Sequence, residues 1–136
     1  MPLDKSTVAD AYVRYLEGHG ERLLSLFATD ALDHVSGQTG AEIWSTVGAW
    51  LQESFADVTV DLHSVAQDDE ARVLVWVTLH GTHVGSAFPW MRDRRPSGRR
   101  VAWQQLHVFR TQGDSITEHW AVRDDLRVLD AIDRAD

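Results

Sequence analysis

The sequence predicts an α+β fold in which helices come first and antiparallel strands follow. Up to Phe55 the apolar residues recur with the spacing of helices, and after Asp57 they alternate with a period of two. This order differs from the alternation of strands and helices that builds a parallel sheet. We therefore expect the N-terminal helices to pack over a strongly curved antiparallel or mixed sheet, and the two layers to enclose a pocket.

Helical patterns account for most of the first part of the chain. In the first segment Val8, Ala11, Tyr12 and Tyr15 form one apolar stripe, and Ser6 is the expected N-cap. Glycines end this helix and separate it from a second, shorter one. The expected segments are helices over residues 6–16, 21–28 and 41–55, and a loop or short strand over residues 30–40.

The strands that follow are separated by turn and loop signals. An acidic turn at residues 67–70 divides the first two strands, and Gly113 with Asp114 forms a tight turn between the last two. Gly81 lies inside a strand pattern, which is typical of a bulge or of a close backbone approach. The expected segments are strands over residues 58–65, 71–80, 103–110 and 116–124, a loop or lid over residues 86–100, and a terminal helix over residues 126–132.

Charge and composition exclude several classes of function. The chain has 13 Lys and Arg against 21 Asp and Glu, a net charge of −8, which argues against nucleic-acid binding because phosphate contacts need cationic side chains. Five arginines between Arg92 and Arg100 are interpreted as a solvated loop. The chain has no cysteine, so disulfides, thiolate metal ligands and a cysteine nucleophile are excluded.

Length and hydropathy indicate one domain over residues 1–136. The N-terminal residues lack the apolar core of a signal peptide, and no apolar run approaches the roughly 18 residues that a membrane span needs. We expect a cytoplasmic protein with no membrane partner.

The last two predicted strands carry most of the residues suited to catalysis. They place His107, His119, Trp120 and Asp124 on either side of one tight turn. Paired strands would bring a histidine, a tryptophan and a carboxylate to the mouth of the space that the sheet encloses. This arrangement favours acid/base chemistry in a pocket.

Five segments in this order carry a wider resemblance. They are Phe55-Ala56-Asp57, Gly81-Thr82-His83-Val84-Gly85, residues 96–101, His107-Val108-Phe109-Arg110, and Glu118-His119-Trp120 followed by Asp124. Together they resemble the SnoaL-like polyketide cyclase family from about residue 12 to residue 132. The resemblance implies the nuclear transport factor 2-like cone, which agrees with the order of helices and strands.

The resemblance also implies an activity and a site. The best-known members of this family close the last ring of an aromatic polyketide ester by intramolecular aldol condensation, without a metal or an organic cofactor. The acid/base aspartate of the family lies four residues after the tryptophan of its Glu-His-Trp segment, a place that Asp124 occupies here. His107 falls where members carry a pocket histidine, and a homodimer is expected.

A carboxyl base for this reaction needs a raised pKa, which apolar walls produce by desolvating the carboxylate. If the face of the last strand that holds Trp120 points inward, Asp124 lies beside His107 in an aromatic cavity. The opposite phase stays open, because a register shift of one residue would put His119 and Arg123 inside. Asp125 is expected to cap the terminal helix, a role that suits aspartate, and the same capping role is the structural alternative for Asp124.

Aromatic and polar residues in several segments are candidates for substrate contacts. Tyrosine and tryptophan join a large apolar surface to one hydrogen-bond donor, so an apolar or aromatic small molecule is the expected partner. The candidates are Tyr12, Tyr15, His34, Trp44, His83, Trp90, Trp103, Gln105 and Trp120. His80 and His83 flank a glycine and lack the spacing of convergent metal ligands, so no metal site is expected.

The leading hypothesis is a cofactor-independent cyclase or isomerase that acts on a polycyclic or polyketide-like carbonyl compound. The alternatives are a hydrolase or hydroxylation-associated member of the same fold, and a non-catalytic protein that binds a small molecule. Fold alone does not separate them, because one scaffold hosts several functions.

Overall fold

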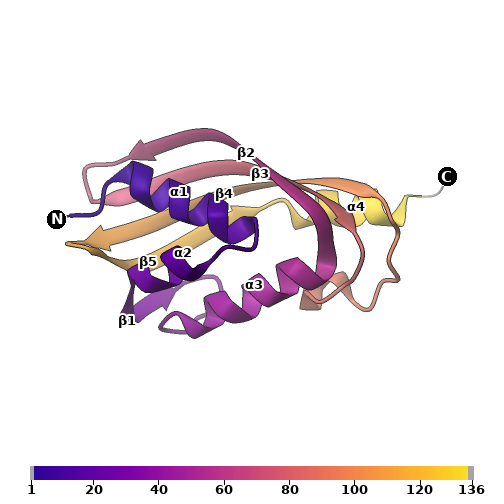
Figure 1. Ribbon diagram of the computed structural model, residues 1–136, viewed down its shortest axis with the longest axis horizontal. Coiled ribbons are helices and arrows are strands. Elements are labelled where there is room, and N and C mark those ends of the chain that lie inside the picture. The colour runs from indigo at the N-terminus through magenta and orange to yellow at the C-terminus, as the bar shows by residue number, and fades with distance from the viewer. Residues whose placement is uncertain (1, 135–136) are drawn as a thin grey trace.

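A computed structural model describes residues 2–134 as helices packed on one face of a curved five-stranded sheet (Figure 1). The strand order is β1-β5-β4-β3-β2, with β1 parallel to β5 and all other neighbours antiparallel. The elements are α1 (Lys5–Leu16), α2 (Glu21–Leu26), β1 (Phe27–Asp33), α3 (Glu42–Ser54), β2 (Phe55–Gln67), β3 (Arg72–His83), the 3₁₀ turn η1 (Pro89–Met91), β4 (Arg100–Gln112), β5 (Ser115–Arg123) and α4 (Asp125–Asp133). The predicted α+β class is confirmed.

The helices follow the predicted apolar stripes with different ends. Asp4, not Ser6, is the N-cap of α1, and its carboxylate accepts a hydrogen bond from the Thr7 backbone N–H at 2.7 Å. The second predicted helix is shorter than expected, because Phe27 already begins β1. In Figure 1, α1, α2 and α3 lie on one side of the sheet, with α4 at the far end from the N-terminus.

Close backbone packing explains the glycine inside β3. The strand continues through Gly81 to His83, and a Cβ atom added at Gly81 would lie 3.0 Å from Cβ of Phe55 on β2. Opposite this glycine, β2 has an irregular register, and Asp57 there takes a left-handed conformation with φ 52°. The glycine therefore allows the two strands to approach closely where the sheet bends.

A bulge in β5 decides which of its side chains face the helices. Thr111 pairs with Ile116 and Arg110 pairs with Glu118, so Thr117 is an extra residue without a partner on β4. An extra residue reverses the alternation of a strand. Ile116 is buried before the bulge and His119 is buried after it, so His119 and the alternate residues that follow face the helices.

The two faces of the sheet differ in character. Along β3 and β4, buried side chains on the inner face alternate with side chains on the outer face. The inner side chains of Val73, Val75, Val77 and Phe109 are inaccessible to solvent. On the outer face several large apolar side chains are exposed. They include Trp76, Leu106 and Val122.

The long loop between β3 and β4 is fastened to His83. The backbone N–H of Ser97 donates to Nδ1 of His83 at 3.1 Å, so the Nε2–H of this ring donates to Ser86 Oγ at 3.0 Å. The Ser86 hydroxyl in turn donates to the carbonyl of Arg94.

None of the helices in residues 2–134 combines the length and the apolar character that crossing a membrane requires.

Candidate active site

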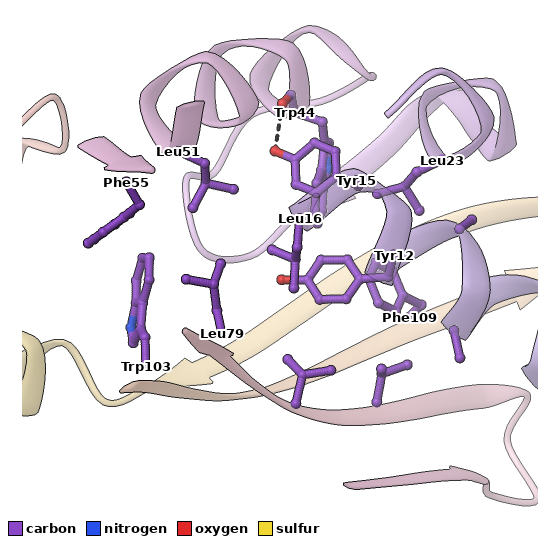
Figure 2. Packing of buried hydrophobic residues seen from close by; sticks show 14 of the residues in the cluster. Tyr12, Tyr15, Leu16, Leu23, Trp44, Leu51, Phe55, Leu79, Trp103 and Phe109 are labelled. Atoms are coloured by element: carbon purple, nitrogen blue, oxygen red, sulfur yellow. Dashed lines mark hydrogen bonds between the residues drawn. The ribbon is translucent and has the colours of Figure 1, made fainter. Parts of the chain in front are cut away.

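A cavity lies between the helices and the inner face of β4 and β5. The space that the centre of a water-sized molecule can occupy in it is about 50 Å³, so the cavity is small compared with most small-molecule sites. Figure 2 shows Tyr12 and Tyr15 reaching from α1 into the space between the sheet and α3. The lining residues are Tyr12, Tyr15, Leu16, Asp33, Val35, Ile43, Trp44, Val47, Leu51, Phe88, Trp103, Gln105, His107, His119, Ala121 and Arg123.

A chain of hydrogen bonds runs through the polar side of this cavity. Oδ1 of Asp33, at the end of β1, lies 2.7 Å from Nδ1 of His119 on β5. Nε2 of His119 lies 2.8 Å from Nδ1 of His107 on β4. All three side chains are buried. The chain therefore joins a buried carboxylate to two stacked imidazoles, and we call it the Asp33–His119–His107 relay.

The relay ends beside a hydroxyl and an amide. Nε2 of His107 lies 2.6 Å from the Tyr12 hydroxyl and 2.7 Å from Oε1 of Gln105, and the Tyr12 hydroxyl donates to the same Oε1 at 2.9 Å. A hydroxyl can donate or accept, and an amide carries both kinds of atom. A protonated Nε2 of His107 donates to Oε1 of Gln105, whereas an unprotonated Nε2 accepts from the Tyr12 hydroxyl, with the Gln105 amide turned to present its NH₂ group.

The direction of the relay follows from its carboxylate end. An ionised carboxylate only accepts, so Nδ1 of His119 carries a proton and donates to Asp33. When His119 is neutral, its Nε2 accepts from the Nδ1–H of His107, and Nε2 of His107 is left as a free base. When His107 gains a proton at Nε2, its Nδ1 proton can pass to His119, where Asp33 faces the new positive charge.

Burial shifts the ionisation of the relay toward neutral histidines. It lowers the pKa of His107 well below the ordinary value, and the charges of His119 and Arg123 act in the same direction. It also lowers the pKa of His119, although the hydrogen bond and charge of Asp33 oppose that change. Burial acts to raise the pKa of Asp33, but hydrogen bonds from His119 and Ser36 outweigh it, and the pKa is lowered.

Serine and backbone groups orient the Asp33 carboxylate. The Ser36 hydroxyl donates to Oδ2 at 2.7 Å, and the backbone N–H groups of Val35 and Ser36 donate to the two carboxylate oxygens. The side chain of Asp33 is 9 % exposed. Four donors, counting His119, thus hold the carboxylate in its ionised form.

Aromatic residues form the remaining walls. The Tyr15 hydroxyl donates to the backbone carbonyl of Trp44 at 2.7 Å, the bond drawn in Figure 2. The Trp44 ring meets His119 edge-on, with ring centroids 4.6 Å apart. At the other end, Phe88 packs edge-on against Trp103. These apolar surfaces exclude water from the histidines, which accounts for their desolvation.

The structure gathers most of the predicted site residues from the N-terminal helices and β4 at this cavity. Tyr12, Tyr15, Trp44, Trp103, Gln105 and His107 all line it. The inward phase expected for residues 103–109 is confirmed by the burial of Trp103, Gln105, His107 and Phe109.

Two predicted substrate contacts lie on the other side of the sheet. The rings of His34 and Trp120 stack with centroids 4.6 Å apart, and His34 Nε2 lies 2.8 Å from a carboxylate oxygen of Glu118. The bulge at Thr117 explains this outcome, because it turns Glu118 and Trp120 outward. The prediction that His34 and Trp120 line the pocket is therefore wrong.

His83 and Trp90 lie beside the cavity wall and do not line it. His83 holds the loop as described above. The Trp90 ring packs against Phe88 and Trp103, with centroids 5.5 and 5.4 Å away. Within residues 2–134 no acceptor reaches its buried indole N–H, so a role of Trp90 in substrate binding stays a prediction.

Asp124 does not face the cavity. Its carboxylate accepts a hydrogen bond from the Arg127 backbone N–H at 3.2 Å, which makes it the N-cap of α4. Asp125, which was expected to cap this helix, instead accepts a hydrogen bond from the Trp103 indole at 2.9 Å. The predicted placement of Asp124 beside His107 is wrong because the bulge in β5 selects the opposite strand phase, which buries His119.

The sequence did not point to Asp33 as a site residue. It placed His119 and Arg123 in the pocket only for the opposite phase of the last strand. Asp33 comes directly before His34 in a segment that was expected to be a loop or short strand. Its signal was a carboxylate at the end of that short strand, followed by the serine and glycine of a turn. The signal for His119 was its inclusion in the Glu-His-Trp segment.

Comparison with known proteins identifies the fold and the family. A model of the SnoaL-like polyketide cyclase family matches residues 6–132. The chain belongs to the SnoaL-like polyketide cyclase family. Among curated proteins no significant sequence match is found. Within residues 2–134 of this family member, no three His, Cys, Asp or Glu side chains are placed to share a metal ion.

Solved structures of several proteins superpose on nearly the whole chain. TsrD from Streptomyces laurentii is 18% identical, with a TM-score of 0.78 over 96% of this chain and 98% of its own. IdmH from Streptomyces antibioticus, a proposed polyketide cyclase, is 26% identical, with a TM-score of 0.76 over 96% and 99%. A protein from Burkholderia thailandensis described as NTF2-like is 20% identical, with a TM-score of 0.70 over 96% and 97%.

Proposed function

We propose that this SnoaL-like protein catalyses cofactor-independent acid/base chemistry on an enolisable carbonyl compound, with His107 as the base. The observation that supports the proposal is the buried Asp33–His119–His107 relay, which ends at the cavity beside Tyr12 and Gln105. Family membership supports ring closure by intramolecular aldol addition as the reaction.

The relay supplies a neutral base and a place for the proton. Nε2 of His107 removes a proton from the carbon next to a carbonyl, and the C–H electron pair becomes the enolate. The Nδ1 proton of His107 passes to Nε2 of His119, 2.8 Å away. The resulting imidazolium faces the Asp33 carboxylate, so the charge is paired inside a low-dielectric site.

The same groups can complete the reaction. The enolate carbon attacks a second carbonyl of the substrate, and the new alkoxide needs one proton. Tyr12 is placed to donate it, because its hydroxyl lines the cavity beside Nε2 of His107, and burial raises the pKa of this hydroxyl so that it is protonated beforehand. The Nε2 proton of His107 then passes to Tyr12 across the 2.6 Å contact, and the proton on Nε2 of His119 returns to Nδ1 of His107, which restores the starting state.

The aromatic lining of the cavity favours a substrate with flat rings. Trp44 and Tyr15 lie at one end and Trp103 with Phe88 at the other, so a planar apolar molecule would contact aromatic surfaces once these walls move apart to admit it. Such walls hold the reacting carbons near His107 and exclude competing water. This supports an aromatic or polycyclic carbonyl compound as the substrate class.

The proposal can be tested without the natural substrate. In D₂O, the exchange of the α-protons of 2-tetralone, a bicyclic ketone, reports enolisation by NMR. The wild-type protein should accelerate the exchange, and His107→Gln should reduce that acceleration by about 10²-fold or more, the usual contribution of a general base. Asp124→Asn is the matched control and should keep the acceleration, since Asp124 lies outside the cavity.

Two results would contradict the proposal. One is a wild-type protein that leaves the exchange at its uncatalysed rate, which favours a binding protein. The other is full acceleration by His107→Gln together with its loss in Asp124→Asn, which would restore the family aspartate as the base.

A further inference from the structure

Arg123 brings a positive charge to the same cavity. It is the last residue of β5, lies on the inner side of the bulge-reversed strand, and pairs in register with Gln105 on β4. Directly opposite residues of antiparallel strands have neighbouring side chains on one face. The Arg123 guanidinium thus lines the cavity next to the amide that contacts His107 and Tyr12.

The hydrogen-bonding capacity of this guanidinium is largely unused. Its carbon lies 5.6 Å from the centroid of the Trp103 ring, which supports one face of the group. Within residues 2–134, Arg123 forms one ion pair, a long contact of 3.6 Å between its Nη2 and Oδ2 of Asp125. The other oxygen of Asp125 accepts from the Trp103 indole N–H. Several N–H donors of Arg123 are therefore left for a ligand.

The positive charge is also incompletely balanced. Asp33, the carboxylate among the residues that line the cavity, pairs with His119 and accepts hydrogen bonds from Ser36. Burial raises the pKa of Asp125, although the charge of Arg123 opposes that change. The Arg123 side chain is only 22% exposed, so solvent screens its charge weakly. An anionic group of a ligand would complete this arrangement.

We propose that Arg123 binds the enolate oxygen of the substrate and so selects carbonyl compounds that enolise readily, such as 1,3-diketones. This inference rests on the proposed function, because it assigns the charge that His107 creates by removing the proton. The carbonyl oxygen that becomes negative would receive N–H donors from Arg123, while the reacting carbon faces His107. Arginine suits this role because its fork of donors stays charged at every relevant pH.

A stable enolate and its neutral counterpart provide the test. Dimedone is an enolate above neutral pH, and its O-methyl enol ether has nearly the same shape without the charge. We expect the wild-type protein to bind dimedone at least about tenfold more tightly than the ether, because hydrogen bonds to charged groups are strong. Titration followed by NMR gives both dissociation constants, and the enolate absorbance gives an independent value.

The variants separate an anion site from a structural arginine. Arg123→Met should abolish the preference for dimedone while the ether binds as before, and Arg123→Lys should keep part of it. Arg127→Met is the matched control, since this exposed arginine of α4 lies outside the cavity, and it should bind both compounds as the wild type does. Near-ultraviolet circular dichroism of each variant checks the packing of the tryptophans.

The outcomes of this test are independent of those for His107. A wild-type protein without a preference for dimedone, including one that binds neither compound, overturns the inference. So does an unchanged preference in Arg123→Met. If His107→Gln stops proton exchange and Arg123→Met still prefers dimedone, only the anion site fails. If Arg123→Met loses the preference and 2-tetralone never exchanges, only the proposed catalysis fails.

Discussion

Nε2 of His119 lies 2.8 Å from Nδ1 of His107, so two buried imidazoles share a single proton between adjacent strands. Only one of the two atoms can donate at a time, and the carboxylate of Asp33 behind His119 determines which state is favoured. This relationship makes Asp33 and His119 positioning residues for the base.

Asp33→Asn should slow enolisation while leaving the fold intact. The asparagine oxygen can still accept from Nδ1 of His119, but it supplies no negative charge to stabilise an imidazolium. The rate of 2-tetralone exchange should fall by about 10²-fold, with a smaller change in the KM for the ketone. An equal loss after Ser25→Ala, a change at an exposed residue of α2 outside the cavity lining, would indicate general damage instead.

The stability of the protein should depend on pH through the two histidines. In the unfolded chain each takes up a proton below about pH 6.5, whereas burial lowers both pKa values in the folded state. The contribution of the two neutral histidines to the free energy of unfolding is therefore fully present above that pH. As the pH falls below it, the free energy of unfolding should decrease by at most about 1.4 kcal/mol per pH unit for each histidine.

Urea unfolding at a series of pH values measures this dependence. His107→Phe removes one of the two groups and should make the slope below about pH 6.5 smaller. Catalysis should persist below that pH for the same reason, because His107 stays unprotonated and able to act as a base. A free energy of unfolding that rises as the pH falls would show that the histidines are held in their charged form.

Substitutions at Asp124 should separate its structural role from catalysis. Asp124→Ala removes the acceptor for the Arg127 N–H and should cost about 1 kcal/mol of stability. Asp124→Asn keeps a capping oxygen and should change stability little. Thermal unfolding compares the two variants with the wild type. Both should retain ketone exchange, and a loss of exchange in both with normal stability would support the aspartate of the family pattern.

The sequence was informative wherever strand alternation continued without interruption. Trp103, Gln105 and His107 were correctly placed on one inward face because β4 alternates regularly over this stretch. The helix order and the apolar stripe with Tyr12 and Tyr15 were also predictable, since helical spacing is a strong local signal. Together these features located the cavity and one member of the relay.

The phase of β5 could not be read from the sequence. A bulge inserts one residue without any required residue type, and Thr117 suits a regular strand equally well. Asp33 was missed for a different reason. Its contact with His119 joins β1 to β5, and a parallel pairing between segments so distant in the chain leaves no local pattern.

A homodimer is expected to form through the outer face of the sheet. The side chains of Trp76, Leu106 and Val122 are 43%, 38% and 74% exposed, and a surface hollow there is lined by all three. Contiguous exposed apolar surface favours association. Sedimentation should give twice the chain mass of 15.3 kDa, and Val122→Arg should produce monomers. Val84→Arg, at an exposed apolar residue outside the strands, should leave the dimer intact, and a monomeric wild type would contradict the expectation.

The single extra residue at Thr117 has a consequence for how such pockets diversify. Deleting it would exchange a wall of His119, Ala121 and Arg123 for one of Glu118, Trp120 and Val122, and so replace a cationic surface by an acidic and aromatic one. Point substitutions would have to change each of the three inward residues separately to produce the same wall. Gain or loss of one residue in a strand therefore offers proteins of this shape a short evolutionary route to a different reaction.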